Sequence, residues 1–579
     1  MLDSTKPNFG YYKRTTMIFA MIIVIAFILK AVFMFIYPIY EDEFNYLAKV
    51  YEYERGELSI PFQCFHVHFL GWLSAFGNNE FNQIVAARIL MYLLLLGTCL
   101  YLFLLAHHFL SIHSSLLTVL CYVCTFFVIA NGASFRSDTP ATFFFMLAIY
   151  YFIVKEDSLF SYLLAGISMA VSIIFTIKAS VYLPLFAIWF LLRQHLIIGW
   201  RKSLQRAAGF WGALVFSFIL LFKLHSSTLV QQTDNLSKGF LNRAFSTFID
   251  FDQLLSAWQW IIRMLILDSV VFFLLICGLI AYMVECIRRR YSRDNPRKYL
   301  PALLTPLLSL LFFKYCRPYL FVFLMPTAMV FCGYGYEFLA AKRIRIKKPS
   351  NILLMALGII LLSNYITSIP RYIRYNDNLT SDQKDILDSI HKIFPEPVPY
   401  VDRFSMVSTY PKVGFFMTEA GTRNYLQNGE PKIKELLTKK KPIFMLENSS
   451  QLNLRSWDNY QPLVNAKIGL LEEDWKALQS YFIHHSGPIW VVGKKFDLKQ
   501  PKETQQFKIL LPGLYTVETK ADIIIDSITY HDGAVINLEV GLHTISTNDL
   551  VTNVKLRGGD HLSRPDISVK GGYLGAPFF

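Results

Sequence analysis

The sequence has 579 residues, of which 54% are hydrophobic and 16% aromatic, and it carries a formal net charge of +14. With a mean hydropathy of +0.37, this composition excludes an ordinary soluble enzyme and indicates a polytopic membrane protein. The positive charge does not indicate a partner made of nucleic acid, because the basic residues fall mainly in short loops between apolar runs.

Eleven apolar runs are candidates for membrane spans, since about 20 residues rising ~1.5 Å each cross a ~30 Å hydrocarbon core. Their approximate limits are 17–37, 84–106, 114–131, 139–154, 158–176, 179–192, 207–224, 262–284, 299–313, 319–338 and 350–369. Some of these runs are short and depend on flanking residues to complete a span. We therefore expect a polytopic α-helical membrane protein with about 11 spans.

The loops between these runs differ in charge. Nineteen Lys and Arg residues fall in loops on the N-terminal side, against eight in the opposite loops before residue 370. This asymmetry predicts a cytoplasmic N-terminus. With an odd number of spans, the chain after about residue 370 is then extracytoplasmic, which is the periplasm if the protein lies in a bacterial inner (plasma) membrane.

The pattern changes to that of a soluble protein from about residue 371. Short apolar strands separated by helical stretches predict a small α/β domain as far as 498. From there on, short strands bounded by Pro512-Gly513 and Asp532-Gly533 turns predict a β-sandwich. We expect a transmembrane catalytic domain over 1–370, an extracytoplasmic α/β domain over 371–498 and an extracytoplasmic β-sandwich domain over 499–579.

Three consecutive carboxylates, Glu41, Asp42 and Glu43, directly follow the first apolar run. Carboxylates at a membrane face are costly unless they are hydrated, paired or used in function. Taken alone, the segment is equally consistent with an acidic loop that merely caps a transmembrane helix. The deciding observation is that later outside turns bring further charged residues to the same face.

Three later turns carry these charges: Arg136-Ser-Asp138 after the third run, Lys178 after the fifth, and Lys314-Tyr-Cys-Arg317-Pro-Tyr319 after the ninth. Carboxylates suit the activation of a hydroxyl or the binding of a divalent metal. Lysine and arginine suit a phosphate group, and arginine can bind two of its oxygens at once. A membrane-facing site with both kinds of charge fits a lipid substrate that carries phosphate.

In this order and topology, the motifs resemble those of the GT-C superfamily of membrane glycosyltransferases. The nearest branch contains the protein O-mannosyltransferases and the aminoarabinose transferase of lipid A, and the similarity covers about residues 17–340. The resemblance implies a polyprenyl-phosphate-linked sugar donor and an extracytoplasmic hydroxyl acceptor, which is an envelope glycan, lipid or protein. A single displacement, with phosphate as the leaving group, would invert the anomeric configuration.

The resemblance also implies roles for individual residues. Asp42 corresponds to the acid that takes the proton of the acceptor hydroxyl, with Glu43 as its neighbour, and Asp138 to a second acid that orients acceptor or metal. The basic residues implied to hold the donor phosphate are Lys178, Arg317, Lys314 and Arg136. The order Arg317-Pro-Tyr319 departs from the commoner Arg-Tyr order of the family, which weakens the assignment of Arg317.

Some relatives bind a divalent metal near these acids, so the resemblance makes a divalent metal ion a candidate cofactor. The candidate ligands are Asp42, Glu43, Asp138 and His66. His66 lies in an aromatic stretch, where histidines more often pack at an interface than bind metal.

Two other classes of function fit a charged membrane face. A flippase or transporter for lipid-linked glycans predicts charges inside the spans and internal repeats, whereas the charges here lie at the outside ends of spans and no repeat is evident. A non-catalytic scaffold would place the function in the C-terminal domains. A polymer ligase with a polyprenyl-linked donor is the enzymatic alternative.

Overall fold

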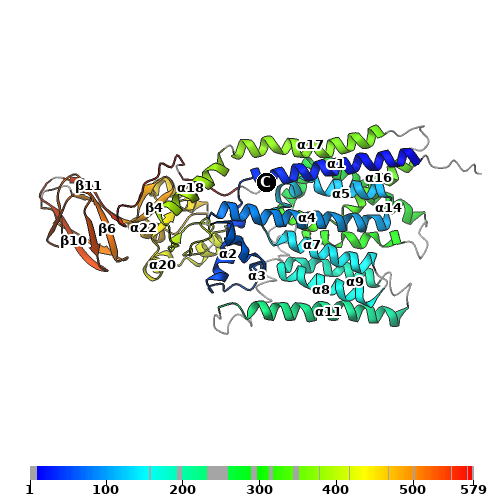
Figure 1. Ribbon diagram of the computed structural model, residues 1–579, viewed down its shortest axis with the longest axis horizontal. Coiled ribbons are helices and arrows are strands. Elements are labelled where there is room, and N and C mark those ends of the chain that lie inside the picture. Colours follow the sequence, from blue (N-terminus) through cyan, green and yellow to red (C-terminus); the bar gives the residue numbers. More distant parts are fainter. Residues whose placement is uncertain are drawn as a thin grey trace, which may run out of the picture.

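The computed structural model describes most of the chain, and structural statements below concern only the described part. The described residues are 9–77, 79–155, 158–191, 199–230, 258–288, 296–311, 317–342, 351–376, 378–415, 417–466, 468–498, 500, 502–549, 551–569 and 571–576. The molecule is elongated, with a bundle of roughly parallel and antiparallel helices at one end and β-sheets at the other (Figure 1). The short helices α2 (Glu41–Glu54) and α3 (Val67–Leu70) lie between these two parts.

Four described helices are long and apolar enough to cross a membrane. They are Thr16–Ile36 within α1 (Phe9–Ile36), α4 (Glu80–Phe109), α11 (Trp200–Ser226) and α14 (Ser269–Ile287). The other helices of the bundle are α5 (Ile112–Val123), α6 (Phe126–Asn131), α7 (Asp138–Ile149), α8 (Leu159–Phe175), α9 (Leu183–Trp189), α13 (Trp258–Leu267), α15 (Tyr319–Leu324), α16 (Val330–Lys342) and α17 (Asn351–Asn376). The predicted class, a polytopic helical membrane protein, is confirmed, and the number of eleven spans stays a prediction.

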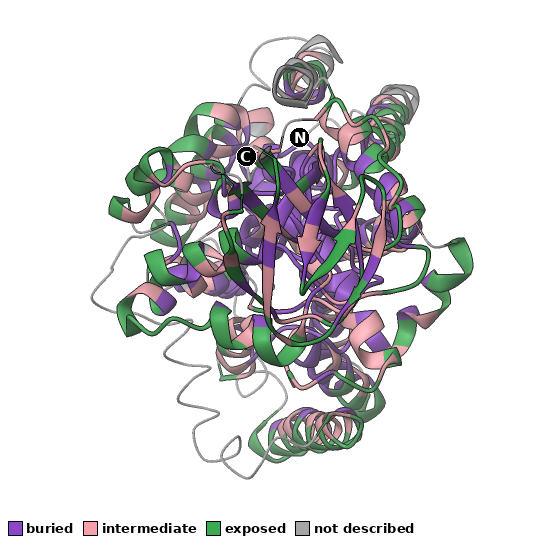
Figure 2. Ribbon diagram, turned by 90° about the vertical axis from the view of Figure 1, so that its left-hand side faces the viewer, coloured by how far each residue is buried: buried purple, intermediate pink, exposed green. Residues whose placement is uncertain are grey.

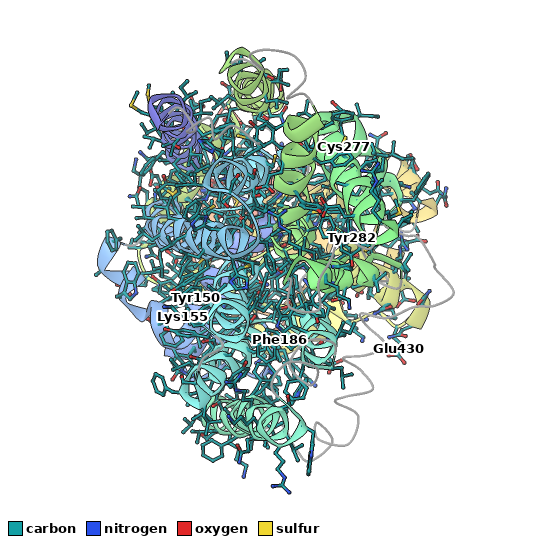
Figure 3. All side chains as sticks on the ribbon, turned by 90° about the vertical axis from the view of Figure 1, so that its right-hand side faces the viewer. Tyr150, Lys155, Phe186, Cys277, Tyr282 and Glu430 are labelled. Atoms are coloured by element: carbon teal, nitrogen blue, oxygen red, sulfur yellow. The ribbon has the colours of Figure 1, made fainter. Side chains whose placement is uncertain are left out.

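Aromatic side chains fill the spaces between the helices of the bundle. Phe186 on α9, labelled in Figure 3, lies among these helices. Its ring packs against those of Phe152 and Phe210, with centroids 4.9 and 4.8 Å away, respectively. The start of α4 shows a local determinant of helix position, because the Asn79 side chain accepts a hydrogen bond from the Phe81 amide at 2.8 Å. Such a cap satisfies a backbone donor that the helix itself leaves unpaired.

The described residues of the C-terminal part form five further α-helices and eleven strands. The helices are α18 (Leu379–Ile393), α19 (Glu419–Asn428), α20 (Ile433–Lys440), α21 (Trp457–Asn465) and α22 (Glu472–Tyr481). The strands are β1 (Tyr400–Val401), β2 (Phe444–Leu446), β3 (Phe482–Ser486), β4 (Ile489–Leu498), β5 (Gln505–Ile509), β6 (Gly513–Glu518), β7 (Ile523–Ile525), β8 (Ile528–Tyr530), β9 (Val535–Leu538), β10 (Gly541–Thr547) and β11 (Val551–Gly558).

These strands form two sheets. One has the order β1-β2-β4-β11-β6-β9 with β3 also paired to β4, and the other has the order β5-β10-β7-β8. Among the strands of the described residues, β1 and β2 pair in parallel and the other pairs are antiparallel. The first sheet crosses residue 498, because β4 pairs with β2 on one side and with β11 on the other. The division into domains at that residue stays a prediction, and the hydrogen-bonded sheet runs across it.

Within the described part of the chain, one of three hydrophobic cores joins the two ends of the molecule. It combines side chains from the segment after α1, such as Phe44 and Leu47, with side chains of the C-terminal part, such as Ile386 and Phe404. The rings of Phe44 and Phe404 stack with centroids 5.9 Å apart. Viewed from the sheet end, the buried residues lie at the centre of the molecule and the exposed ones at its periphery (Figure 2). This shared core is the setting of the candidate site.

Candidate active site

The three acids that follow α1 have different surroundings, and Glu43 is the most deeply buried, with 0% of its surface exposed. Its Oε1 accepts hydrogen bonds from the Phe135 amide and from Arg88 Nε, both at 2.8 Å. Its Oε2 accepts from the Tyr40 amide at 3.0 Å and from Arg88 Nη2 at 2.5 Å. The bond from Tyr40 also closes the start of α2, since Glu43 is the third residue of the helix.

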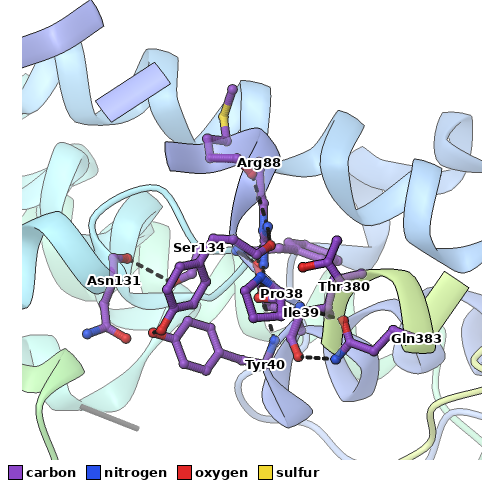
Figure 4. Close-up of polar contacts among 12 residues, drawn as sticks. Pro38, Ile39, Tyr40, Arg88, Asn131, Ser134, Thr380 and Gln383 are labelled. Carbon is purple, nitrogen blue, oxygen red and sulfur yellow. Dashed lines mark hydrogen bonds and ion pairs between the residues drawn. The ribbon is translucent and has the colours of Figure 1, made fainter. Parts of the chain in front are cut away.

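Arg88, on α4, extends this buried network to the end of the first span. Its guanidinium donates to the main-chain oxygens of Met34, Tyr37 and Pro38 at 3.0, 2.7 and 2.9 Å. Figure 4 shows Arg88 above the Pro38–Tyr40 turn that these bonds hold. The Glu43–Arg88 pair thus determines how the chain leaves α1 and enters α2, and it leaves Glu43 outside the cavity described next.

A cavity of about 270 Å³ lies beside α2. Its lining residues are Asp42, Asn45, Tyr46, Lys49, Ile60, Phe62, Gln63, Cys64, Arg136, Lys178, Tyr319 and Thr418. Asp42, Asn45, Tyr46 and Lys49 come from α2, so one face of this helix forms a wall. Thr418 belongs to the C-terminal part, which therefore completes the cavity.

Arg136 is the centre of the charged network in this cavity. Its guanidinium donates to Asp42 and, at 3.2 Å, to Asp138 Oδ2. Lys178 Nζ lies 3.7 Å from Asp138 Oδ1. The side chain of Asp42 is 21% exposed, whereas those of Arg136 and Asp138 are 5% and 4% exposed. Asp42 is therefore the acid of this network that a substrate in the cavity can reach.

Tyr319, the first residue of α15, lies against both basic side chains. The Arg136 guanidinium is 3.6 Å and Lys178 Nζ is 4.8 Å from the centre of its ring. Cation–π contacts of this kind hold a positive charge without neutralising it. Arg317, two residues earlier, is half-buried and is not among the lining residues. Lys314 lies outside the described residues.

Two residues that line the cavity, Tyr46 and Thr418, were not among the site residues expected from the sequence. The Tyr46 hydroxyl is 2.9 Å from the Ser137 hydroxyl, next to the Arg136 and Asp138 pair. Burial raises the pKa of Tyr46 to about 12, so its phenol stays protonated near neutral pH. Only Tyr46 had a local signal, its place among aromatic residues after the acids, and Thr418 had none, because its position depends on tertiary contacts.

His66 is buried against the rings of Tyr46 and Phe135 and does not line the cavity. Its Nε2 is 2.9 Å from the Tyr46 carbonyl oxygen, and burial lowers its pKa to about 4, so the imidazole is neutral at pH 7. Among the described residues, no group of three His, Cys, Asp or Glu side chains is placed to hold a metal ion. Arg136 lies between Asp42 and Asp138, where a shared cation would otherwise bind. These side chains, as arranged, do not fit a divalent metal.

Two solved structures resemble this one over most of its length. The structure of ArnT from Cupriavidus metallidurans in the apo state matches with a TM-score of 0.50 and 13% identity, over 77% of this chain and 94% of that one. The oligosaccharyltransferase from Archaeoglobus fulgidus, in complex with Zn and sulfate, matches with a TM-score of 0.50 and 10% identity, over 94% and 98%. No protein-family model and no curated protein sequence matches the chain. At these identities, the likeness concerns the fold.

Proposed function

Because the chain has the fold of the GT-C membrane glycosyltransferases, we propose that it transfers a sugar from a polyprenyl-phosphate-linked donor to a hydroxyl group. The acceptor is an extracytoplasmic glycan, lipid or protein of the cell envelope. The observation that carries the proposal is the cavity that joins Asp42, Arg136 and Lys178 at the junction between the helical bundle and the C-terminal part. A partly exposed carboxylate next to basic groups is what such a transfer requires.

In this proposal, Asp42 is the base. Its carboxylate takes the proton of the acceptor hydroxyl as that oxygen attacks the anomeric carbon and the bond to the donor phosphate breaks. Arg136 orients the carboxylate through their ion pair. Asp138 holds the other side of the guanidinium and contacts Lys178. One displacement without a covalent intermediate inverts the configuration at the anomeric carbon.

The departing phosphate needs positive charge, and Lys178 is the residue that we propose to supply it. Its ammonium group lines the cavity and is held between Asp138 and the Tyr319 ring. Arg317 and Lys314 precede Tyr319 closely in the sequence. We propose that they supply further positive charge to the departing phosphate. Arg136, which already binds two carboxylates, is assigned to orienting the acids rather than to the phosphate.

We also propose the topology that places this chemistry in the cell. The protein is a multi-pass membrane protein, and the bias of basic residues places its N-terminus in the cytoplasm. The cavity and the C-terminal part then face the periplasmic side of a bacterial inner membrane. A donor lipid would approach from that leaflet, and the acceptor from the aqueous side.

The test measures transfer of radiolabelled sugar from a panel of polyprenyl-phosphate sugars to mixed envelope acceptors by the purified full-length protein. The variant Asp42→Asn removes the base while keeping the shape of the side chain. Glu57→Gln is the matched control, because Glu57 is exposed and pairs with Arg55, which directly follows the end of α2. We expect transfer by wild type and by Glu57→Gln, and a loss of at least about a hundredfold in Asp42→Asn.

Two results would contradict the proposal. Full activity of Asp42→Asn in correctly folded protein would exclude Asp42 as the base, and a product with the configuration of the donor would exclude single displacement. Binding of polyprenyl phosphate without transfer from any donor would favour a flippase or a scaffold instead.

A further inference from the structure

Glu41, the first residue of α2, is contacted by two residues that are far away in the sequence. The Tyr573 hydroxyl donates a hydrogen bond to Glu41 Oε2 at 3.0 Å, and Arg403 Nη2 lies 3.4 Å from the same oxygen. The Arg403 guanidinium also lies over the Tyr573 ring, 5.1 Å from its centre. Glu41 is 7% exposed and does not line the cavity, but it precedes Asp42 directly.

Tyr573 belongs to the segment Gly571–Ala576, which runs along the turn between α1 and α2. The Ala576 amide donates to the Ile39 carbonyl at 3.1 Å, and Ala576 forms an isolated parallel bridge with Tyr40. Gln383 on α18 joins the two segments. It accepts from the Ile39 amide and donates to the Ile39 carbonyl, both at 2.9 Å (Figure 4). It also donates to the Leu574 carbonyl at 2.7 Å.

Glycine spacing shows how closely this segment packs on Glu41. A Cβ atom on Gly575 would lie 3.0 Å from the Tyr573 hydroxyl oxygen and 3.4 Å from Glu41 Cβ. Gly571 has a φ of +84°, and a Cβ there would lie 3.0 Å from the Glu447 carboxyl carbon. Gly575 allows the close approach to Glu41, and Gly571 adopts a left-handed backbone conformation, so both positions favour glycine.

The rest of the C-terminal part holds the same turn of α2. The Ser408 hydroxyl donates to the Phe44 carbonyl at 2.8 Å, and the Phe404 ring stacks on Phe44. The opposite side of the turn is held by the buried Glu43–Arg88 pair. Asp42 therefore lies on a helical turn that is fixed from both sides, by the helical bundle and by the C-terminal part.

We propose that the segment Gly571–Ala576 and Arg403 position the first turn of α2, through Glu41, so that the Asp42 carboxylate meets Arg136 in the cavity. Glu41, Tyr573 and Arg403 are then positioning residues, and the inference rests on the proposed role of Asp42. The C-terminal part is, on this account, a component of the active site and not a separate module. Sugar transfer requires it to be docked on α2.

The ionisation of Glu41 offers a readout that a merely structural contact would not change. Burial raises the pKa of Glu41, and the charge of Asp42 raises it further, whereas Arg403, the Tyr573 hydrogen bond and the charge of Arg317 lower it. As the pH falls, Glu41 therefore becomes neutral before an exposed glutamate does, and its pairing with Arg403 is lost. Removal of the Tyr573 hydroxyl moves this loss to higher pH.

The experiment compares Tyr573→Phe and Glu41→Gln with the control Tyr515→Phe. This control also removes a tyrosine hydroxyl that donates a hydrogen bond, in this case to the Leu511 carbonyl in the sheet region. We expect kcat to fall by about tenfold in Tyr573→Phe, with KM for the donor within about twofold of wild type. The acid limb of its pH–activity profile should move to higher pH. The double variant should lose no more than the larger single loss, because both changes break one interaction.

Hydrogen–deuterium exchange on α2 tests the contact without any sugar donor. Faster exchange of residues 41–54 in Tyr573→Phe than in Tyr515→Phe supports the contact, even if wild type transfers no sugar and the proposed function fails. Equal exchange in the two variants overturns the inference. The inference is also overturned if Tyr573→Phe has the kcat and pH profile of wild type while Asp42→Asn is inactive. Asp42 would then be shown to be needed for transfer, and transfer would not depend on the segment Gly571–Ala576.

Discussion

The buried Glu43–Arg88 pair makes a strong prediction about stability. In Arg88→Met, the Glu43 carboxylate keeps the amides of Tyr40 and Phe135 but loses both guanidinium bonds. Breaking a buried ion pair from one side costs about 3–5 kcal/mol. The three carbonyls that Arg88 also serves add roughly 1 kcal/mol each. The free energy of unfolding of a folded domain is only about 5–15 kcal/mol, so this single change should remove a large share of it.

The assay is thermal unfolding of the purified protein in detergent. We expect the Tm of Arg88→Met to fall by roughly 5–7 °C, because the unfolding entropy that converts the lost free energy into a temperature shift grows with the length of the chain, here 579 residues. Lys439→Met is the control, because the exposed Lys439–Glu435 pair should contribute little. The double variant Glu43→Leu with Arg88→Met should recover part of the loss, since no buried charge then lacks its partner. A Tm of Arg88→Met within about 2 °C of wild type would refute the reasoning.

Three further predictions concern charge and pH. Lys178→Gln should raise KM for a polyprenyl-phosphate sugar by roughly ten- to a hundredfold, measured by steady-state transfer, as a charge-assisted hydrogen bond to phosphate is lost; an unchanged KM would remove Lys178 from the phosphate site. Chelation with EDTA should leave the transfer rate within about twofold, because Arg136 already lies between the two acids, and a loss that Mn²⁺ or Mg²⁺ restores would contradict this. Burial opposes the charge of His391, but its hydrogen bond to Glu80 outweighs burial and raises its pKa. The stabilisation by the His391–Glu80 pair is therefore complete below the ordinary pKa of histidine and is lost as the pH rises through the raised pKa. His391→Gln should accordingly lower Tm more at pH 6 than at pH 9.

The membrane class and the general fold were predictable from sequence. Apolar runs of span length are a local property. The order of Asp42, Arg136-Ser-Asp138, Lys178 and the late Arg317-Pro-Tyr319 along them identified the resemblance to GT-C enzymes, whose fold the solved structures confirm. The prediction that these residues return to one face follows from topology alone. The structure agrees with it for the residues that line or border the cavity, while their catalytic roles stay predictions.

The distinction between neighbouring acids was beyond the sequence. Successive residues on a helix point about 100° apart, so Glu41, Asp42 and Glu43 necessarily face different surroundings. Which surroundings each one meets depends on partners from distant parts of the chain. Arg88 buries Glu43, Arg136 meets Asp42, and Tyr573 binds Glu41 across 532 residues of sequence.

The sequence by itself therefore determined the class, a helical membrane protein, and singled out Asp42, Arg136, Asp138 and Lys178, which lie together in the structure. Hydrophobic length and charge order suffice for this because both are read locally along the chain. Only the tertiary structure decided which acid is exposed to the cavity and that Arg136 bridges two carboxylates. It also showed that β4 carries one sheet across the boundary expected at residue 498. Each of these depends on hydrogen bonds and ion pairs between segments that periodicity does not link.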